Sequence, residues 1–235
     1  MTRTYQCSDP ADRKAGIAAA VDAVRRGDLI VMPTDTLYGI GADAFTPTAV
    51  DALLAAKQRG RDMPVPVLVG SQRTLDGLVL AVPPAVRDLV DAFWPGPLTI
   101  VVEQAPSLAW DLGDADGTVA IRMPLHPVAL EVLDATGPMA VSSANVSGQP
   151  PATTADQAWD QLGWLVEVYL EAGSIGEPVA STIIDVTGDV PRVLRQGALD
   201  LARLRSVVPE ALDADGRGPD DEPVAASGGG REQSS

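Results

Sequence analysis

The chain has 235 residues, of which 46% are hydrophobic and 21% are charged, so it can bury a full core in one domain or at most two. Its formal net charge of −15 argues against a surface that coats nucleic acid, because neutralising phosphates takes many Lys and Arg side chains. No stretch approaches the roughly 18 apolar residues of a membrane span, so we expect no contact with membranes. The single cysteine, Cys7, excludes an internal disulfide, so we expect a cytoplasmic protein.

Helical and strand-like segments alternate along the chain. Helical spacing of apolar residues marks residues 10–26, 46–58, 83–93 and, more loosely, 127–135. Strand-like apolar runs fall at residues 29–33, 65–69, 98–103, 118–124, 138–142, 166–170, 181–186 and 192–196. This alternation predicts an α/β or α+β sheet with helices packed on it, and we assign residues 1–208 to one domain.

The helix at residues 46–58 carries a cationic end. Lys57 continues the apolar stripe of this helix, so its stem is expected to run along apolar surface with the ammonium directed to the mouth of a cleft. It opens the stretch KQRGR, residues 57–61, which packs three cations into an acidic chain. Cations also favour helix C-termini by about 0.3 to 1 kcal/mol each, so the cluster by itself does not establish a site.

Further polar groups follow predicted strands. PTDTLYG at residues 33–39 and SSANVSG at residues 142–148 each come after an apolar run, Arg122 ends a strand, and Arg195 lies in VLRQG. Each feature alone is also typical of turns or of solvated strand ends. Together, in a chain with few other catalytic groups, they favour a shared nucleotide pocket.

The sequence excludes several kinds of catalytic site. His126 is the only histidine and Cys7 the only cysteine, so a zinc site with several such ligands is excluded, and a triad or dyad would need one of these two. His126 lies between two prolines at a helix start, where we expect a structural role. A P-loop motif is absent, and G-x-G-x-x-A at residues 39–44 lacks the tight strand-to-helix turn of a dinucleotide site, so its glycines are interpreted as allowing close backbone approach. Chemistry by positioning and charge remains, which is typical of nucleotidyl transfer.

The C-terminal stretch, residues 209–235, combines Gly, Pro and Ser with seven acidic and two basic residues. We expect this tail to be disordered, because it offers almost nothing to bury.

The segments PTDTLYGIGADA, KQRGRDMPVPVLV, FWPGPLTIVV, VAIRMP, SSANVSGQPP, STIIDVTG and VLRQG occur in this order in the YrdC-like family, the threonylcarbamoyl-AMP synthases, which the chain resembles over residues 15–200 in the single-domain form. The resemblance implies an α/β fold, a twisted mixed sheet with flanking helices around a central concave cavity. It also implies a nucleotidyltransferase that makes threonylcarbamoyl-AMP and pyrophosphate from L-threonine, bicarbonate and ATP. The product would supply the threonylcarbamoyl modification of tRNA adenosine 37.

The same resemblance assigns roles to individual residues. Lys57 and Arg59 would be catalytic and would neutralise the phosphates of ATP. The nucleotide would also be held by Thr118, Ser143, Asn145 and Arg195, and L-threonine by Thr36, Arg122 and Val141. Mg²⁺ would accompany the triphosphate with few protein ligands implied, none of them assigned to a residue. Expected partners are downstream tRNA threonylcarbamoyl-transfer enzymes, with at most a weak contact to tRNA.

Departures from the family pattern keep rival functions open. Many members have an asparagine and a histidine where this chain has Met63 and Leu68, so contacts made there would have to come from backbone or water. Many also carry a second C-terminal domain. The first rival is an RNA-binding module, which the acidic body of the chain disfavours. The second is a carbamoyl transfer of the hydrogenase-maturation type. The third is a pure scaffold, which would leave an inward-facing Lys57 unexplained.

Overall fold

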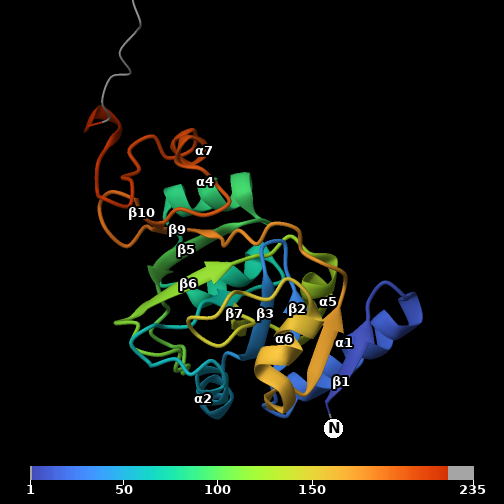
Figure 1. Cartoon of the computed structure of the whole chain (residues 1–235). Coiled ribbons are helices and arrows are strands. Elements are labelled where there is room, and N and C mark those ends of the chain that lie inside the picture. The colour runs from blue at the N-terminus through green and yellow to red at the C-terminus, as the bar shows by residue number, and fades with distance from the viewer. Residues whose placement is uncertain (1, 222–235) are drawn as a thin grey trace, which may run out of the picture.

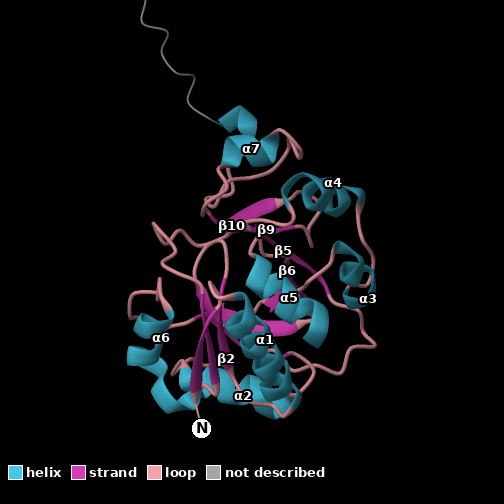
Figure 2. Cartoon of the chain, turned by 90° about the vertical axis from the view of Figure 1, so that its right-hand side faces the viewer, coloured by secondary structure: helices cyan, strands magenta, loops and turns pink. Residues whose placement is uncertain are grey.

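The computed structural model describes residues 2–221, and within them the chain forms one ten-stranded sheet with helices on both faces (Figures 1 and 2). The strands are β1 (Arg3–Gln6), β2 (Ile30–Pro33), β3 (Tyr38–Asp43), β4 (Val67–Leu68), β5 (Leu98–Glu103), β6 (Thr118–Arg122), β7 (Met139–Ser143), β8 (Val168–Glu171), β9 (Thr182–Asp185) and β10 (Arg192–Arg195). The helices are α1 (Pro10–Arg25), α2 (Pro47–Ala56), α3 (Leu75–Leu78), α4 (Pro84–Phe93), α5 (Pro127–Thr136), α6 (Ala155–Leu162) and α7 (Leu201–Arg205), and the 3-10 turns are η1 (Gln72–Thr74), η2 (Gly163–Leu165) and η3 (Pro219–Asp221). None of these helices has the length and apolar content needed to cross a bilayer. The mixed α/β fold that we expected is confirmed.

The sheet has two halves joined by a very short strand. Its order is β1-β8-β2-β3-β7-β4-β6-β5-β9-β10, with both parallel and antiparallel pairs. The joining strand β4 has two residues, and it pairs antiparallel with β7 and parallel with β6. In Figure 1 the half that contains β5, β6, β9 and β10 lies above the half that contains β2, β3 and β7. The strands turn relative to one another across the sheet, as the handed twist of β-strands requires.

Helices cover both faces of the lower half. Ile30 and Met32 point to the face covered by α1 and α5, whereas Val31 between them belongs to the core cluster on the opposite face, near α2 and α6 (Figure 2). This alternation follows the two-residue period of a strand, and all three side chains are fully buried. The sequence therefore reads as an uninterrupted apolar run here.

Helix ends follow the local signals in the sequence. Helix α5 begins after His126, whose Nδ1 accepts a hydrogen bond from the Val128 N–H at 3.3 Å, so the lone histidine has the structural role that we expected. Helix α4 ends at Phe93, directly before Trp94 and Pro95, as predicted.

Strands β1 and β3 were not predicted. We interpreted the glycine-rich stretch at 39–44 as backbone open to close approach, and it is instead the strand β3. The close approach itself is confirmed, because a Cβ at Gly39 would lie 2.7 Å from Val141 Cγ1 and one at Gly41 2.9 Å from Met139 Cε. The glycines are thus the residues that let β3 lie against the large side chains of β7.

The segment after residue 208 differs from our expectation of disorder as far as residue 221. Ala211 is fully buried, the Leu212 N–H donates to Pro191 O at 2.9 Å, and Leu212 O accepts from the Val193 N–H at 2.9 Å. The many charged residues of the tail drew attention away from Ala211 and Leu212, two apolar residues that pack beside β10. The expected disorder of residues 222–235 concerns a stretch outside the described residues.

Candidate active site

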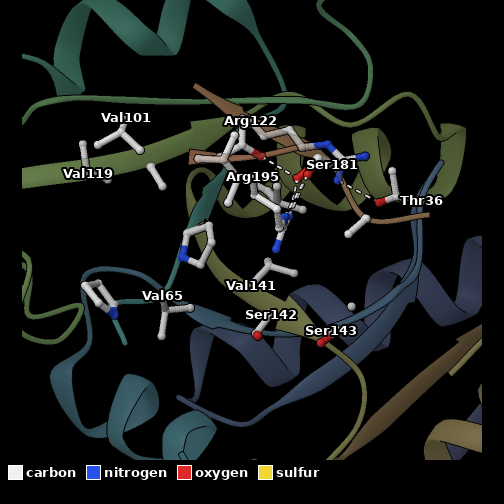
Figure 3. Close-up of a pocket in the computed structure, with 18 of the residues that line it drawn as sticks. Thr36, Val65, Val101, Val119, Arg122, Val141, Ser142, Ser143, Ser181 and Arg195 are labelled. Carbon is white, nitrogen blue, oxygen red and sulfur yellow. Dashed lines mark hydrogen bonds between the residues drawn. The ribbon is translucent and has the colours of Figure 1, made fainter. Parts of the chain in front are cut away.

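A cavity of about 480 Å³ lies between the two halves of the sheet. Figure 3 shows Val65, Val101 and Val119 on one side of it and Thr36, Arg122 and Ser181 on another, so apolar and polar walls are separated. No Asp or Glu is among the described residues that line it. The cavity thus offers arginines and hydroxyls without a competing carboxylate wall, inside a chain whose net charge is −15. Anionic ligands suit such a site.

Arg122 is fixed at the polar wall by three partners. Its Nε donates to Gly96 O at 3.0 Å, its NH1 to Thr36 Oγ1 at 2.8 Å, and its NH2 to Asp35 Oδ1 at 2.5 Å. The residue is only 6% exposed, and burial lowers its pKa while Asp35 acts in the opposite direction. A guanidinium stays charged at neutral pH even so, and three of its five N–H groups are held in place. Asp35 was not predicted as a site residue.

Lys57 lies behind the cavity wall. It is the C-cap of α2 and is 2% exposed, so the burial of its stem is as expected. Its ammonium is not directed to a cleft mouth, because Nζ donates to Ser143 O at 2.6 Å and to Asn145 O at 2.8 Å. Burial and, to a smaller extent, the charge of Arg59 together lower the pKa of Lys57 to about 8. The ammonium therefore ties the end of helix α2 to the loop that follows β7.

Asn145 also shapes that loop. Its Nδ2 donates to Val146 O at 3.0 Å and to Gln149 O at 2.7 Å, and the residue is buried. Neither Asn145 nor Lys57 lines the cavity, whereas Ser143 does. Together the three residues form a support under the cavity floor, at which Ser142 and Ser143 are exposed to the cavity (Figure 3).

Arg59 lines the cavity with unused hydrogen-bonding capacity. Its NH2 donates to Pro64 O at 3.1 Å, and its NH1 approaches Ser142 Oγ at 3.4 Å. Its Nε is buried and has no hydrogen-bond partner among the described residues. Burial lowers the pKa of Arg59. A buried donor without a partner is costly.

Arg195 enters the cavity from the upper half of the sheet (Figure 3). Its Nε and NH2 donate to Ser181 O at 3.1 and 2.8 Å, and NH2 also approaches Ser181 Oγ at 3.2 Å. Ser181 Oγ in turn lies 2.8 Å from Thr99 Oγ1. The register of β10 against β9 shifts between Val193 and Arg195, and such a bulge re-aims side chains. Burial lowers the pKa of Arg195.

The remaining expected residues also reach the cavity. Thr36, Thr118 and Val141 line it, and Thr118 is held by bonds from its N–H and hydroxyl to Ala115 O at 2.8 and 2.7 Å. Sequence reasoning missed Ser142 and Ser181, although both stand in segments that it singled out, SSANVSG and STIIDVTG. A signal existed in each case, because Ser142 lies near the end of β7 and Ser181 directly precedes β9.

The part of the chain that the structure describes contains no cluster of side chains typical of a metal-binding site. No group of three or more His, Cys, Asp or Glu side chains lies there in an arrangement that could hold a metal ion. A metal ion that accompanied a bound phosphate ligand could take oxygens from that ligand and from water.

Comparisons with known proteins agree with this architecture. Residues 22–197 match the Sua5/YciO/YrdC family model, described as telomere recombination. A Mycobacterium tuberculosis H37Rv protein, named for an inferred threonylcarbamoyl-AMP synthase activity, is 60% identical over 208 residues, 88% of this chain and 96% of the relative. The Pyrococcus abyssi threonylcarbamoyl-AMP synthase is 35% identical over 195 residues, 83% of this chain and 57% of the relative.

A solved structure is similar in fold and in sequence. P. abyssi Sua5 complexed with L-threonine matches with a TM-score of 0.83 and 31% identity, over 91% of this chain and 62% of that one. The chain thus spans less than two thirds of the archaeal protein and nearly all of the mycobacterial one. Since the family model covers most of the sequence and the fold agrees, this chain belongs to the Sua5/YciO/YrdC family.

Proposed function

We propose that this protein is a nucleotidyltransferase that makes threonylcarbamoyl-AMP and pyrophosphate from L-threonine, bicarbonate and ATP. The observation that carries the proposal is the cavity itself, which has arginines on several sides, no acidic lining residue among those described, and a buried Arg59 Nε without a partner. The names of the mycobacterial and archaeal relatives support the same reaction. In that reaction the threonine amine and bicarbonate form a carbamate with loss of water. A carbamate oxygen then attacks the α-phosphorus, and pyrophosphate leaves.

Phosphate binding is proposed for the arginines and the hydroxyls of the cavity floor. Arg59 and Arg195 would neutralise the triphosphate and the charge that moves onto pyrophosphate, while Ser143 would donate a hydrogen bond. Lys57 and Asn145 would act on the nucleotide through residues 143–149, because the Lys57 ammonium and the Asn145 amide bond backbone carbonyls of this stretch. This refines our expectation that Lys57 touches phosphate directly.

Threonine binding is proposed at the opposite, polar wall. The Arg122 guanidinium, held by Asp35, Thr36 and the Gly96 carbonyl, would grip the substrate carboxylate. Thr36 and Val141 would flank the side chain. L-threonine is the ligand named for the P. abyssi structure. A preformed grip of this kind orients the amine for reaction with little loss of entropy on binding.

The apolar end of the cavity is proposed to receive the nucleobase. Val65, Leu112 and Val119 supply apolar contacts, and Thr118 lines the same cavity. Mg²⁺ would bind to triphosphate oxygens and water rather than to a protein cage, and it would offset phosphate charge there.

Partners and location follow from this chemistry. The product would pass to enzymes that transfer threonylcarbamoyl to tRNA adenosine 37, with at most a weak tRNA contact by this acidic chain. A cytoplasmic location fits the single thiol, Cys7.

The test is an incubation of the purified protein with ATP, magnesium, bicarbonate and L-threonine, followed by pyrophosphate release and mass detection of the adenylate. Threonine-dependent release with the mass of threonylcarbamoyl-AMP is expected. ATP binding without turnover would direct attention to Met63 and Leu68, which stand where many relatives have Asn and His. Absence of ATP binding, together with salt-dependent RNA affinity, would replace the proposal with an RNA-binding module.

A further inference from the structure

The third cation of KQRGR, Arg61, does not line the cavity that holds the proposed triphosphate site. Its NH1 donates to Asp51 Oδ1 at 2.9 Å, and its NH2 is paired with Asp111 Oδ1. Asp51 lies on α2, and Asp111 lies in the connection between β5 and β6, residues 104–117. Arg61 thus links a helix of one half of the molecule to a long connection of the other.

That connection builds the apolar wall of the cavity. Leu112 and Ala115 line the cavity, and Thr118 follows directly at the start of β6. Two backbone bonds dock the connection beside Arg61, from the Val65 N–H to Leu112 O at 2.9 Å and from the Asp114 N–H to Arg61 O at 2.8 Å. The wall therefore depends on the segment that contains Arg61 for its position.

Other contacts show how closely the connection is seated. Trp110 stacks on Phe45 with ring centroids 5.5 Å apart. Gly113 has φ +108°, and a Cβ there would lie 2.8 Å from Arg61 O and 3.2 Å from Pro64 Cα. Long connections of this type hold a defined position only through such links, because closing them costs entropy.

We propose that Arg61 is a positioning residue that sets the affinity for the nucleoside part of ATP by clamping the 104–117 connection against α2. The inference rests on the proposed function, since it assumes that a nucleotide base rests on this wall. The effect is expected to be modest, because the Arg61 side chain is 41% exposed and exposed ion pairs couple weakly.

Charge alone would produce a different pattern from a clamp. Removing the Arg61 cation and removing the Asp111 anion change the field at the triphosphate in opposite directions. If the ion pair instead acts by holding the 104–117 connection in place, either substitution breaks the pair, and both should have the same effect. Arg61→Gln and Asp111→Asn are therefore expected to weaken ATP binding in the same direction, each about three- to fivefold.

The experiment is calorimetric titration of ATP into the wild type, Arg61→Gln, Asp111→Asn and the double variant, with steady-state kinetics beside it. The double variant is expected to bind no more weakly than the poorer single variant. The KM for ATP rises, while kcat at saturating ATP and the KM for threonine stay within about twofold of the wild type. Arg87→Gln is the matched control, since Arg87 is paired with Asp76 in an exposed ion pair and neither residue lines the cavity.

A charge-free variant provides an independent test. Gly113→Ala should displace the wall and raise the ATP KM, whereas Gly117→Ala, at another positive φ of +78° with no neighbour within 4 Å, controls for backbone strain. Opposite shifts for Arg61→Gln and Asp111→Asn, or affinities equal to those of the wild type, would overturn the inference while the wild type still binds ATP. A wild type that fails to bind ATP would instead overturn the proposed function.

Discussion

At the scale of single residues, the buried Lys57 ammonium should give the enzyme a pH dependence. Its pKa is about 8, so in the folded protein the side chain loses its charge as the pH rises through 8 and its hold on the Ser143 and Asn145 carbonyls weakens. We expect kcat/KM to fall above that pH. Lys57→Arg keeps its charge throughout, so its profile should lack this decline, while titration of the substrates is shared by both proteins. If the pH profiles of kcat/KM for the wild type and Lys57→Arg coincided, the decline could not be assigned to Lys57.

The same group should affect stability with the opposite sign. Since its folded pKa of about 8 is below the ordinary 10.5, the unfolded chain binds more protons between these two values. The destabilising contribution of Lys57 is therefore fully present below pH 8 and disappears as the pH rises toward 10.5. Denaturant titrations should show a smaller loss of stability between pH 8 and 10 for the wild type than for Lys57→Met, which keeps an apolar stem without the proton. A larger loss in the wild type would refute this.

Arg122 should control threonine affinity separately from ATP affinity. Lysine at this position can keep the charge but cannot bond Gly96 O, Thr36 and Asp35 together while presenting a planar fork to a carboxylate. We expect Arg122→Lys to raise the KM for threonine by about 10-fold or more, on the scale of a lost charged hydrogen bond. The KM for ATP should change little. Arg195→Lys is the complementary control, because its larger effect is expected on ATP; equal effects of both variants on both substrates would argue against separate subsites.

At the scale of elements, the sequence predicted most strands and helices because their signals are local. The apolar runs of β2 and β5 and the proline-capped starts of α2 and α4 are such signals. Strand β3 escaped because glycines count against strands unless a neighbouring strand requires them, and that neighbour, β7, lies about a hundred residues away in the chain.

The sequence predicted those residues of the candidate site that lie in recognisable motifs. Arg59, Arg122 and Arg195 reach one cavity, as the resemblance implied. The direction of the Lys57 ammonium was not predictable, because the carbonyls that it binds belong to a loop 86 residues farther along the chain. The same holds for Asp35, whose importance appears only when Arg122 of β6 is placed against it. Long-range pairings of this kind leave no local signature.

The position of the connection from β8 to β9 should depend on Gly197, a small residue in the turn after β10. A Cβ on Gly197 would lie 2.3 Å from Ala180 O and 2.5 Å from the Ser181 carbonyl carbon, and these are backbone atoms that cannot rotate away. Gly197→Ala should therefore displace the Ser181 carbonyl that holds Arg195. We expect an increase in the KM for ATP and a loss of about 1–3 kcal/mol in the free energy of unfolding, as for overpacking.

Gly176→Ala is the control in the same connection, since a Cβ there has nothing within 4 Å. It should leave both the KM for ATP and the unfolding free energy near those of the wild type. If Gly197→Ala behaved like Gly176→Ala, Arg195 would not need this acceptor.

At the scale of the whole molecule, charge is segregated rather than uniform. The chain carries a net charge of −15, yet the described lining of the cavity between the two halves of the sheet contains arginines and no acid. A negative exterior disfavours long polyanions, while a local cationic cavity still attracts a small anion, because the charges that are closest to the ligand dominate its energy. This combination favours a nucleotide over RNA as the ligand.

The C-terminal segment gives the last test, because part of it supports the sheet edge that carries Arg195. Besides the buried Ala211, the Arg192 NH2 donates to Ala214 O at 2.9 Å, and the Arg205 Nε donates to Ala211 O at 2.9 Å. Deleting residues 209–235 should lower the melting temperature by several degrees, since about 1 kcal/mol corresponds to roughly 2–4 °C in a domain of this size. It should also raise the KM for ATP, because β10 loses its partner Leu212.

Deleting only residues 222–235 should leave both quantities unchanged, since that stretch is rich in Gly, Ser and Ala and offers little to bury. Thermal unfolding and ATP kinetics of the two truncated proteins, measured side by side with the full chain, check both expectations. Equal melting temperatures for all three would show that residues 209–221 contribute nothing to the edge of the sheet. A loss already complete in the shorter deletion would instead place the stabilising contacts beyond residue 221.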